Sequence, residues 1–169
     1  MFIDESGLSE RPQRVRSWAP RGQTPVLQYS FNWKLLSVIA GISFWQFYFR
    51  LYPGTIRTAQ IVEFLGHLRR QVGARLLIIW DRLPGHRSRR VREYVAATNG
   101  DIELEFLPAY APELNPSEQI FNHGKNREMA NFCPANFQHL RSFTRRSLRR
   151  MQRRPELIAA FWRQAELAF

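Results

Sequence analysis

Two of the three aspartates in this 169-residue chain come directly after short apolar runs. Asp4 follows residues 1–3, and Asp81 follows the run RLLIIW at residues 75–80. Because α/β folds place their chemistry at the C-terminal ends of sheet strands, we expect both carboxylates at such ends. Glu118 lies at the start of a predicted helix, behind a proline-rich loop. The three carboxylates are therefore able to converge from two strands and one helix.

These carboxylates suit the ligand preference of a hard divalent cation. Mg²⁺ and Mn²⁺ prefer oxygen donors, and one or two carboxylates with substrate phosphate usually suffice for each ion. Two ions about 3.5–4 Å apart stabilise the attacking and leaving oxygens of an in-line phosphoryl displacement. Each residue alone is also common in a turn, a cap or the first turn of a helix. Their combination on a basic chain favours a metal site of Asp4, Asp81 and Glu118.

Hydrophobic periodicity predicts the elements that position these side chains. The continuous apolar run at residues 75–80 indicates a strand that is buried on both faces. Strands come first along the chain, helices then alternate with strands, and the last third is helical. This order predicts an α/β fold with a central mixed sheet, flanking helices and a helical C-terminus. The other predicted elements are a strand hairpin over 34–52, helices over 58–72 (with Thr58 as N-cap), 88–98 and about 117–131, and a strand over 102–107.

The charge balance of the chain is strongly basic. It has 25 basic and 14 acidic residues, a net charge of +11, and all the basic residues except Lys34 and Lys125 are arginine. This excess favours nucleic acid as a partner before a membrane surface, although a merely arginine-rich globular protein has the same composition. The single cysteine excludes an internal disulfide and a multi-cysteine zinc site. No apolar run approaches the roughly 20 residues of a membrane span, and no signal-peptide pattern begins the chain, so we expect an intracellular protein.

Much of the positive charge falls at the end of the chain. Residues 136–169 contain eight arginines and two glutamates. Arg141, Arg145 and Arg149 recur every four residues and therefore share one face of a predicted helix. This face is either a solvated surface or a row of contacts to DNA phosphates, and we predict the DNA contacts.

The sequences around the three carboxylates resemble a known family. FIDESG at residues 2–7, IIWDRLPGH at 78–86 and LPAYAPELNPSEQIFNHGK at 107–125 are similar to the three blocks of a DDE transposase domain. The resemblance is to the mariner-like insertion-sequence transposases of bacteria, and the third block is its most specific part. The segment NREMANFCP at 126–134 is also similar to the one that follows in this family.

The resemblance implies a fold, a reaction and partners. The fold is ribonuclease-H-like, and Asp4, Asp81 and Glu118 are the catalytic residues that bind two Mg²⁺ or Mn²⁺ ions. The implied reaction cleaves phosphodiesters at the ends of a mobile element and joins the freed 3′-hydroxyl to target DNA. The expected partners are transposon-end and target DNA, bound by a homodimer without any membrane. The expected location is the bacterial cytoplasm, at the nucleoid.

Three more residues near the blocks are predicted to contact DNA. The family carries a histidine at the position of His86, which suits a phosphate contact, support of the metal ligands or a local loop hydrogen bond. Arg82 stands where the family typically has asparagine, and it is able to pair with Asp81 or to grip DNA. Lys125 is predicted to share a helix face with Asn122 and Glu118, and either contacts phosphate or is solvated.

Residues 1–169 are predicted to form one DDE catalytic domain. The resemblance implies that its first strand is clipped and that the helix-turn-helix modules of the family are absent. One alternative function is a catalytically inactive remnant that binds DNA nonspecifically through its basic C-terminal helices. Another is a cellular nuclease of the same fold, and the least favoured is a plain structural protein.

Overall fold

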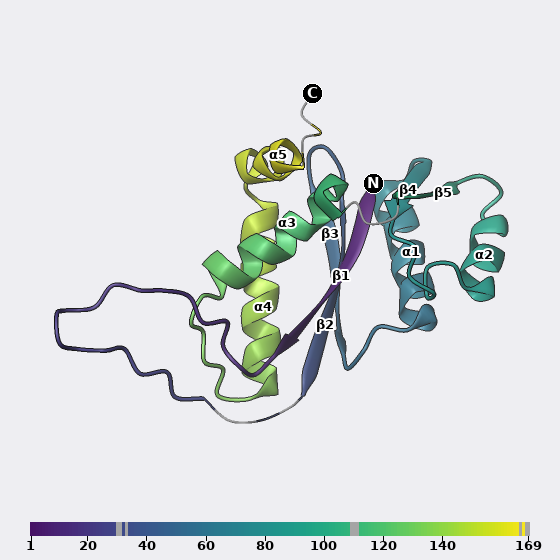
Figure 1. Ribbon diagram of the computed structural model, residues 1–169. Helices are drawn as coiled ribbons and strands as arrows, with labels where there is room; N and C mark the ends of the chain where they lie inside the picture. The colour runs from purple at the N-terminus through teal and green to yellow at the C-terminus, as the bar shows by residue number, and fades with distance from the viewer. Residues whose placement is uncertain (30–31, 33, 109–111, 166, 168–169) are drawn as a thin grey trace.

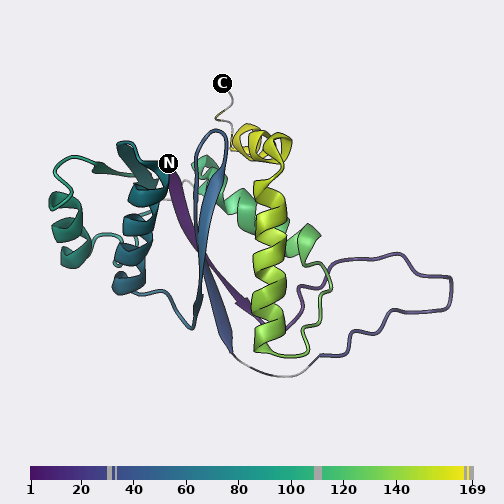
Figure 2. The same cartoon turned by 180° about the vertical axis from the view of Figure 1, so that it is seen from behind.

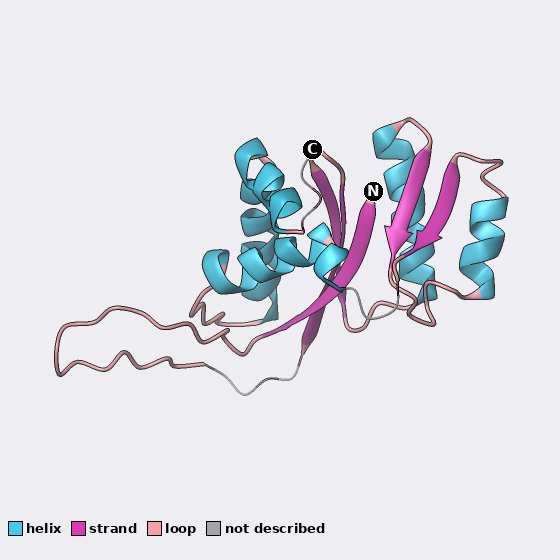
Figure 3. Ribbon diagram, turned by 45° about the horizontal axis from the view of Figure 1, so that its top comes forward, coloured by secondary structure: helices cyan, strands magenta, loops and turns pink. Residues whose placement is uncertain are grey.

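A five-stranded mixed sheet forms the centre of the computed structural model, which describes residues 1–29, 32, 34–108, 112–165 and 167. The strand order is β3-β2-β1-β4-β5, so the N-terminal strand lies in the middle of the sheet (Figure 3). β1 is antiparallel to β2 and parallel to β4. The strands are β1 (Phe2–Ser9), β2 (Leu35–Ile42), β3 (Phe47–Pro53), β4 (Leu76–Trp80) and β5 (Ile102–Phe106).

Helices cover both faces of this sheet (Figure 1). One face packs against α1 and α2, and the other packs against α3, α4 and α5. The predicted α/β class, with a mixed sheet, flanking helices and a helical C-terminus, is therefore confirmed. The helices are α1 (Thr58–Val72), α2 (Arg89–Ala96), α3 (Pro116–His123), α4 (Phe137–Gln152) and α5 (Pro155–Gln164), with a 3₁₀ turn at Pro112–Leu114 and a π turn, η2, at Gly124–Glu128. Among the described residues, no helix is both long and apolar enough to cross a membrane.

Alternation along the central strands separates the two cores. In β2, Val38 and Ala40 belong to the core beneath α3–α5, whereas Ile39 between them belongs to the core beneath α1 and α2. Successive side chains of a strand point to opposite faces, so Ile3 and Asp4 of β1 divide in the same way. Ile3 is buried with Ile39, and Asp4 therefore lies on the face that α3 covers.

The structure corrects two predicted element boundaries. Asp4 does not end a strand, because β1 continues to Ser9 and pairs with β2 along its whole length, from Phe2↔Ile42 to Ser9↔Leu35. The polar residues after Ile3 hid this continuation, which the backbone ladder with β2 stabilises. The helix predicted over about 117–131 ends as α3 at His123 and continues only as the π turn.

A smaller correction concerns the first helix. Arg57, not Thr58, is its N-cap, and Thr58 is its first residue. The backbone nitrogen of Arg57 donates to the side-chain oxygen Oε1 of Gln60, over 3.1 Å. The shift is a single residue, and the predicted end of the helix at Val72 is confirmed.

A long excursion joins β1 to β2 and extends away from the body of the fold (Figures 1 and 2). Near its start, the amide side chain of Asn131 bonds the backbone of Val15 in both directions, each over 2.9 Å. Gln13 forms an isolated bridge with Ala130. Beyond these contacts, most of residues 16–29 are exposed, and Trp18 is fully so.

Candidate active site

Asp4 is positioned by the middle strand of the sheet. Its Oδ1 accepts a hydrogen bond from the backbone nitrogen of Glu5, over 2.7 Å. Burial, with the negative charges of Glu118, Asp81 and Glu5, raises the pKa of Asp4 to about 7 against the lowering effect of that hydrogen bond. A buried carboxylate with acidic neighbours is a site that favours a cation.

Asp81 directly follows β4, as the sequence predicts. Its Oδ1 accepts from the backbone nitrogen of Leu83 over 2.9 Å and lies 2.6 Å from Nδ1 of His86. Partial burial acts to raise the pKa of Asp81, but these two hydrogen bonds and the charge of His86 outweigh it and lower the pKa. Asp81 therefore stays ionised while Asp4, nearby, is far easier to protonate.

His86 is buried next to Asp81 and fixes the orientation of its carboxylate. Its side chain is 1% exposed and stacks on Trp80, with ring centroids 4.3 Å apart. Its Nε2 lies 3.2 Å from Oε1 of Glu5, so each ring nitrogen faces a carboxylate. Burial disfavours the charged ring, yet the hydrogen bonds to Asp81 and Glu5 prevail and raise the pKa of His86 to about 9. The ring is thus a cation at neutral pH, with both nitrogens as donors.

The burial of His86 disagrees with a direct contact to DNA phosphate. No surface of its ring is open to a ligand, because Trp80, Asp81 and Glu5 enclose it. The structure favours the other predicted role, in which His86 orients a metal ligand. Such partners fix the direction of a ligating side chain and strengthen it as a donor.

Glu118 comes from the first turn of α3. The side chain of Asn115 caps this helix by accepting from the backbone nitrogen of Ser117, over 3.2 Å, and Pro116 is its first residue. Burial raises the pKa of Glu118, followed by the charges of Glu113 and Asp81. The charges of Glu118 and Asp81 act on Asp4, and the charge of Asp81 acts on Glu118, so the three predicted carboxylates share one neighbourhood.

The donors gather but do not form a closed shell. Within the described part of the chain, no group of three or more histidine, cysteine, aspartate or glutamate side chains is close enough together to hold an ion. The donor set nevertheless fits Mg²⁺ or Mn²⁺ in kind, since it consists of carboxylate oxygens on a strand, after a strand and on a helix. In the described residues, no hydrogen bond engages the second oxygen of Asp4 or of Asp81, which leaves each available as a ligand.

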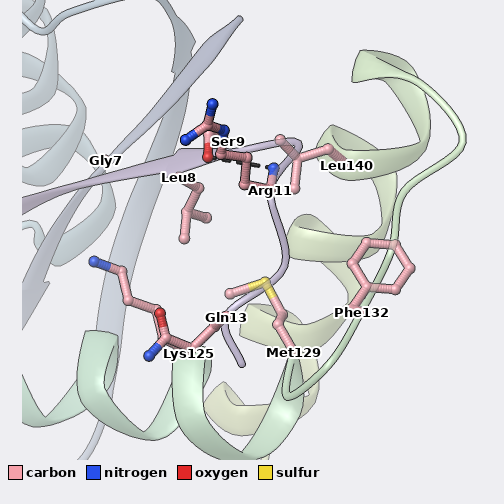
Figure 4. Close-up of a pocket in the computed structure, with 9 residues that line it drawn as sticks. All are labelled: Gly7, Leu8, Ser9, Arg11, Gln13, Lys125, Met129, Phe132 and Leu140. Atoms are coloured by element: carbon pink, nitrogen blue, oxygen red, sulfur yellow. Dashed lines mark hydrogen bonds between the residues drawn. The ribbon is translucent and has the colours of Figure 1, made fainter. Parts of the chain in front are cut away.

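Lys125, in η2, places a positive charge near Asp4. Half-burial lowers the pKa of its amine, and the charge of Asp4 opposes that shift. Lys125 also lines a small hollow beside the end of β1, where its amine points away from Met129 (Figure 4). The remaining residues of that hollow are Gly7, Leu8, Ser9, Arg11, Gln13, Phe132 and Leu140.

Glu118 and Asn122 lie four residues apart in α3, whereas Lys125 lies beyond this helix in η2, so the common face predicted for the three residues stays a prediction. Asn122 lines a different hollow and accepts a hydrogen bond from Asn126, over 2.7 Å. η2 is a π turn, in which the backbone nitrogen of Met129 donates to the carbonyl of Gly124 five residues earlier, so the regular α-helical spacing ends before Lys125. Such turns change the helical register and often mark functional sites.

Arg82 is tied to the neighbouring strand rather than to Asp81. Its Nε donates to the carbonyl of Leu107, just beyond β5, over 3.2 Å. Arg82 remains exposed, so its contact with DNA stays a prediction.

Arg141, Arg145 and Arg149 are not gathered with the carboxylates. They line a groove with β3 and α1, at the edge of the sheet, whereas the carboxylates come from β1, the end of β4 and α3. Their contact with DNA also stays a prediction, but it concerns a different part of the surface.

Sequence reasoning missed Glu5. The residue is one-fifth exposed and completes the pair of carboxylates around His86. The position of Glu5 beside Asp4 is plain in the sequence, but its role as a partner of His86 follows only from the burial of that histidine. An adjacent acidic pair together with a loop histidine was the available signal.

The fold and this constellation of carboxylates define a class of phosphodiester-cleaving proteins. The sequence profile of the DDE superfamily endonuclease family matches residues 1–141, and the chain belongs to that family. The predicted membership of the DDE superfamily is thereby confirmed. No curated protein matches the chain in sequence.

Solved structures of the Mos1 mariner transposase share the fold. The Mos1 paired-end complex with Mn is 22% identical, with a TM-score of 0.68 over 98% of this chain and 51% of that one. The paired-end complex with Mg is 19% identical, with a TM-score of 0.70 over 98% and 52%. The isolated Mos1 catalytic domain is 19% identical, with a TM-score of 0.54 over 95% and 81%. The predicted ribonuclease-H-like fold is confirmed, and the chain spans about half the length of the Mos1 chains in the paired-end complexes.

Proposed function

We propose that this chain is the catalytic domain of a mariner-type transposase, which cleaves DNA at element ends and joins the 3′-hydroxyl to target DNA. The observation that carries the proposal is that the charges of Asp81 and Glu118 act on Asp4, and that the charge of Asp81 acts on Glu118, although the three residues come from separate elements. Membership of the DDE endonuclease family and the mariner-like fold support it. The Mos1 structures in complex with transposon-end DNA support DNA as the partner.

We propose that Asp4, Asp81 and Glu118 hold two divalent ions, Mg²⁺ or Mn²⁺. When bound, such ions supply activation of the attacking oxygen and stabilisation of the leaving oxygen. The residues around the carboxylates orient these ligands and offset their negative charge. His86 fixes the rotamer of Asp81 through a charge-assisted hydrogen bond of 2.6 Å, and Lys125 places positive charge beside Asp4. The further proposals are a homodimer on transposon-end and target DNA, and a location at the bacterial nucleoid.

The decisive experiment is nicking of supercoiled plasmid with Mg²⁺ or Mn²⁺. We expect conversion of supercoiled to open-circular DNA that requires the metal and falls at least about 100-fold in Asp81→Ala, because a metal ligand is lost. Glu103→Gln, at an exposed position of β5, is the matched control and should nick like the wild type. Nicking that survives in Asp81→Ala would contradict the proposal.

The same assay distinguishes the proposed transposase from a second candidate function. The absence of a closed carboxylate shell among the described residues favours, as the second candidate, an inactive remnant that only binds DNA. A chain that binds duplex with a steep salt dependence but nicks with neither metal would identify that remnant.

A further inference from the structure

A groove of about 640 Å³ lies where α1, β3 and α4 meet at the edge of the sheet. Gln46 and residues 47–51 of the outer strand β3 line one side, α1 contributes His67 and Gln71, and α4 contributes Arg141, Arg145, Arg149 and Gln152. Within the described residues, β3 pairs only with β2, so no further strand covers this edge. Figure 2 shows α4 along the sheet on the side away from α1.

The lining of this groove is cationic. Arg50, Arg141, Arg145 and Arg149 belong to it, and none of its lining residues is acidic. The nearest acid on α1 is Glu63, which lies 3.2 Å from Arg50 and neutralises that arginine alone. Burial, followed by the charges of Arg50 and Arg70, lowers the pKa of His67, so the ring is neutral at pH 7.

The three arginines that α4 contributes to the groove have no counter-ion among the described residues. Among the described residues, no ion pair engages Arg141, Arg145 or Arg149, whereas Arg150 on another face of the same helix pairs with Glu128. The Nε of Arg141 is buried and has no hydrogen-bond partner in the described structure. Because they recur every four residues, the three side chains leave the helix about 6 Å apart along its axis.

We propose that this edge groove binds the phosphodiester backbone of a DNA segment other than the segment held at the carboxylates. The inference rests on the proposed function for the identity of DNA as partner. A regular row of unpaired guanidinium groups matches a polymer that repeats one anion, and phosphate is the anion for which arginine is best shaped. A protein partner is less suited, because its interface normally centres on buried apolar anchors, and this lining is mainly polar.

The groove and the carboxylates occupy different parts of the molecule. α3, which carries Glu118, packs on β1 and β2, while the groove opens along β3 on the far side of α4. Binding in the groove is therefore able to hold a second stretch of DNA without entering the cleavage site. It provides backbone contacts that carry no sequence information.

The test is fluorescence anisotropy of labelled DNA with EDTA present, so that no cleavage is needed. The variant carries Arg141→Gln, Arg145→Gln and Arg149→Gln, and the probes are a 30-base-pair duplex and a single strand of the same length. We expect the affinity to fall at least about 10-fold at moderate salt, and the slope of log K against log salt to fall by about 3 for the duplex. Loss confined to one probe identifies which form of DNA occupies the groove.

A matched variant controls for net charge. Arg75→Gln, Arg90→Gln and Arg92→Gln remove three exposed arginines near β4 and on α2, outside the groove. We expect at most about a 3-fold loss of affinity in this variant. Equal losses in both triple variants, or wild-type affinity in the groove variant, would overturn the proposal. Circular dichroism and the denaturation midpoint of both variants verify that they fold.

The outcome is independent of catalysis. If the wild-type chain fails to nick plasmid, the proposed function fails, and the metal-free binding comparison still decides the groove. If the groove variant binds like the wild type while the wild type nicks, the groove inference alone fails.

Discussion

His86 is a buried cation whose two ring nitrogens each face a carboxylate. Burying a charge costs several kcal/mol unless it is paired and hydrogen-bonded, and Asp81 and Glu5 supply both conditions. The pairing turns Oδ1 of Asp81 towards the protein interior. Its second oxygen is left for a ligand, so the histidine presets one donor of the site before any ion arrives.

Asp4 is predicted to destabilise the metal-free protein above neutral pH. Its pKa is about 7 in the folded chain and 3.8 in the reference state. The folded state therefore binds more protons between these values, and stability falls as the pH rises through that window. Asp4→Asn removes this dependence, so in EDTA at pH 8 we expect its free energy of unfolding to exceed that of the wild type by on the order of 2–4 kcal/mol.

Urea denaturation at pH 8 and near pH 4 measures the difference, which should largely vanish at the lower pH. Glu103→Gln removes an exposed carboxylate from β5 and serves as the control. An Asp4→Asn variant that is less stable than the wild type at pH 8 would refute the account of a strained carboxylate.

At the scale of residues, the sequence predicted the carboxylates that follow a distinctive apolar or proline-rich segment. Asp4, Asp81 and Glu118 stood out by type and by the apolar or proline-rich segments before them. The role of His86 and its partner Glu5 could not be predicted, because it depends on burial against Trp80 and on a contact across 81 residues. Local sequence does not encode which loop side chain turns inward.

The start of α3 is the element that sets Glu118 in place. Asn115 is buried and caps the helix, while Glu118 lies in its first turn. Asn115→Ala removes the cap, so we expect a loss of about 1–2 kcal/mol in stability. It should also slow metal-dependent nicking, because fraying of the first turn displaces Glu118.

Asn136→Ala offers a matched comparison. Asn136 caps α4 in the same way, accepting from the backbone nitrogen of His139 over 2.9 Å, but α4 carries none of the three carboxylates. We expect a similar loss of stability with nicking close to wild type, measured at a temperature where both variants are folded. Equal effects of the two caps on nicking would mean that stability alone explains them.

At the scale of elements, hydrophobic periodicity predicted which helices and strands exist, and in which order, better than it predicted where each one ends. The apolar run of β4 and the amphipathic α1 were predicted within a residue of their observed bounds. The full length of β1 could not be predicted, because Asp4, Glu5 and Ser6 break the apolar pattern while the ladder to β2 maintains the strand. The π turn after His123 also escaped prediction, since helical spacing presumes a constant register.

For the whole molecule, we predict that Mn²⁺ raises the melting temperature. An ion that binds only the folded chain stabilises it by RT ln(1 + [L]/Kd), which is about 2.7 kcal/mol at 100 times the Kd. The site draws on β1, the residue after β4 and α3, so the gain should appear as one shifted transition. Differential scanning fluorimetry with and without Mn²⁺ measures it.

Asp81→Asn is the informative variant in that experiment. It keeps the side-chain volume but removes a charged donor, so we expect most of the Mn²⁺-dependent shift to disappear. Glu103→Gln, at an exposed position of β5, should retain the full shift. A shift that persists in Asp81→Asn would mean that Mn²⁺ binds elsewhere on the chain.

The junction between β1 and β4 is unusually thin for the centre of a sheet. It consists of the single pair Phe2↔Ile79, with hydrogen bonds from Met1 to Leu77 over 2.6 Å and from Ile79 to Met1 over 2.8 Å. By contrast, β1 meets β2 over its full eight residues. In mechanical terms we expect a junction with so few hydrogen bonds to yield more easily than the β1–β2 ladder, and Asp4 and Asp81 lie on its two sides. Ions bound by carboxylates on both sides of this junction would cross-link β1 to the end of β4. The stiffness of the sheet would then depend on whether the metal site is filled.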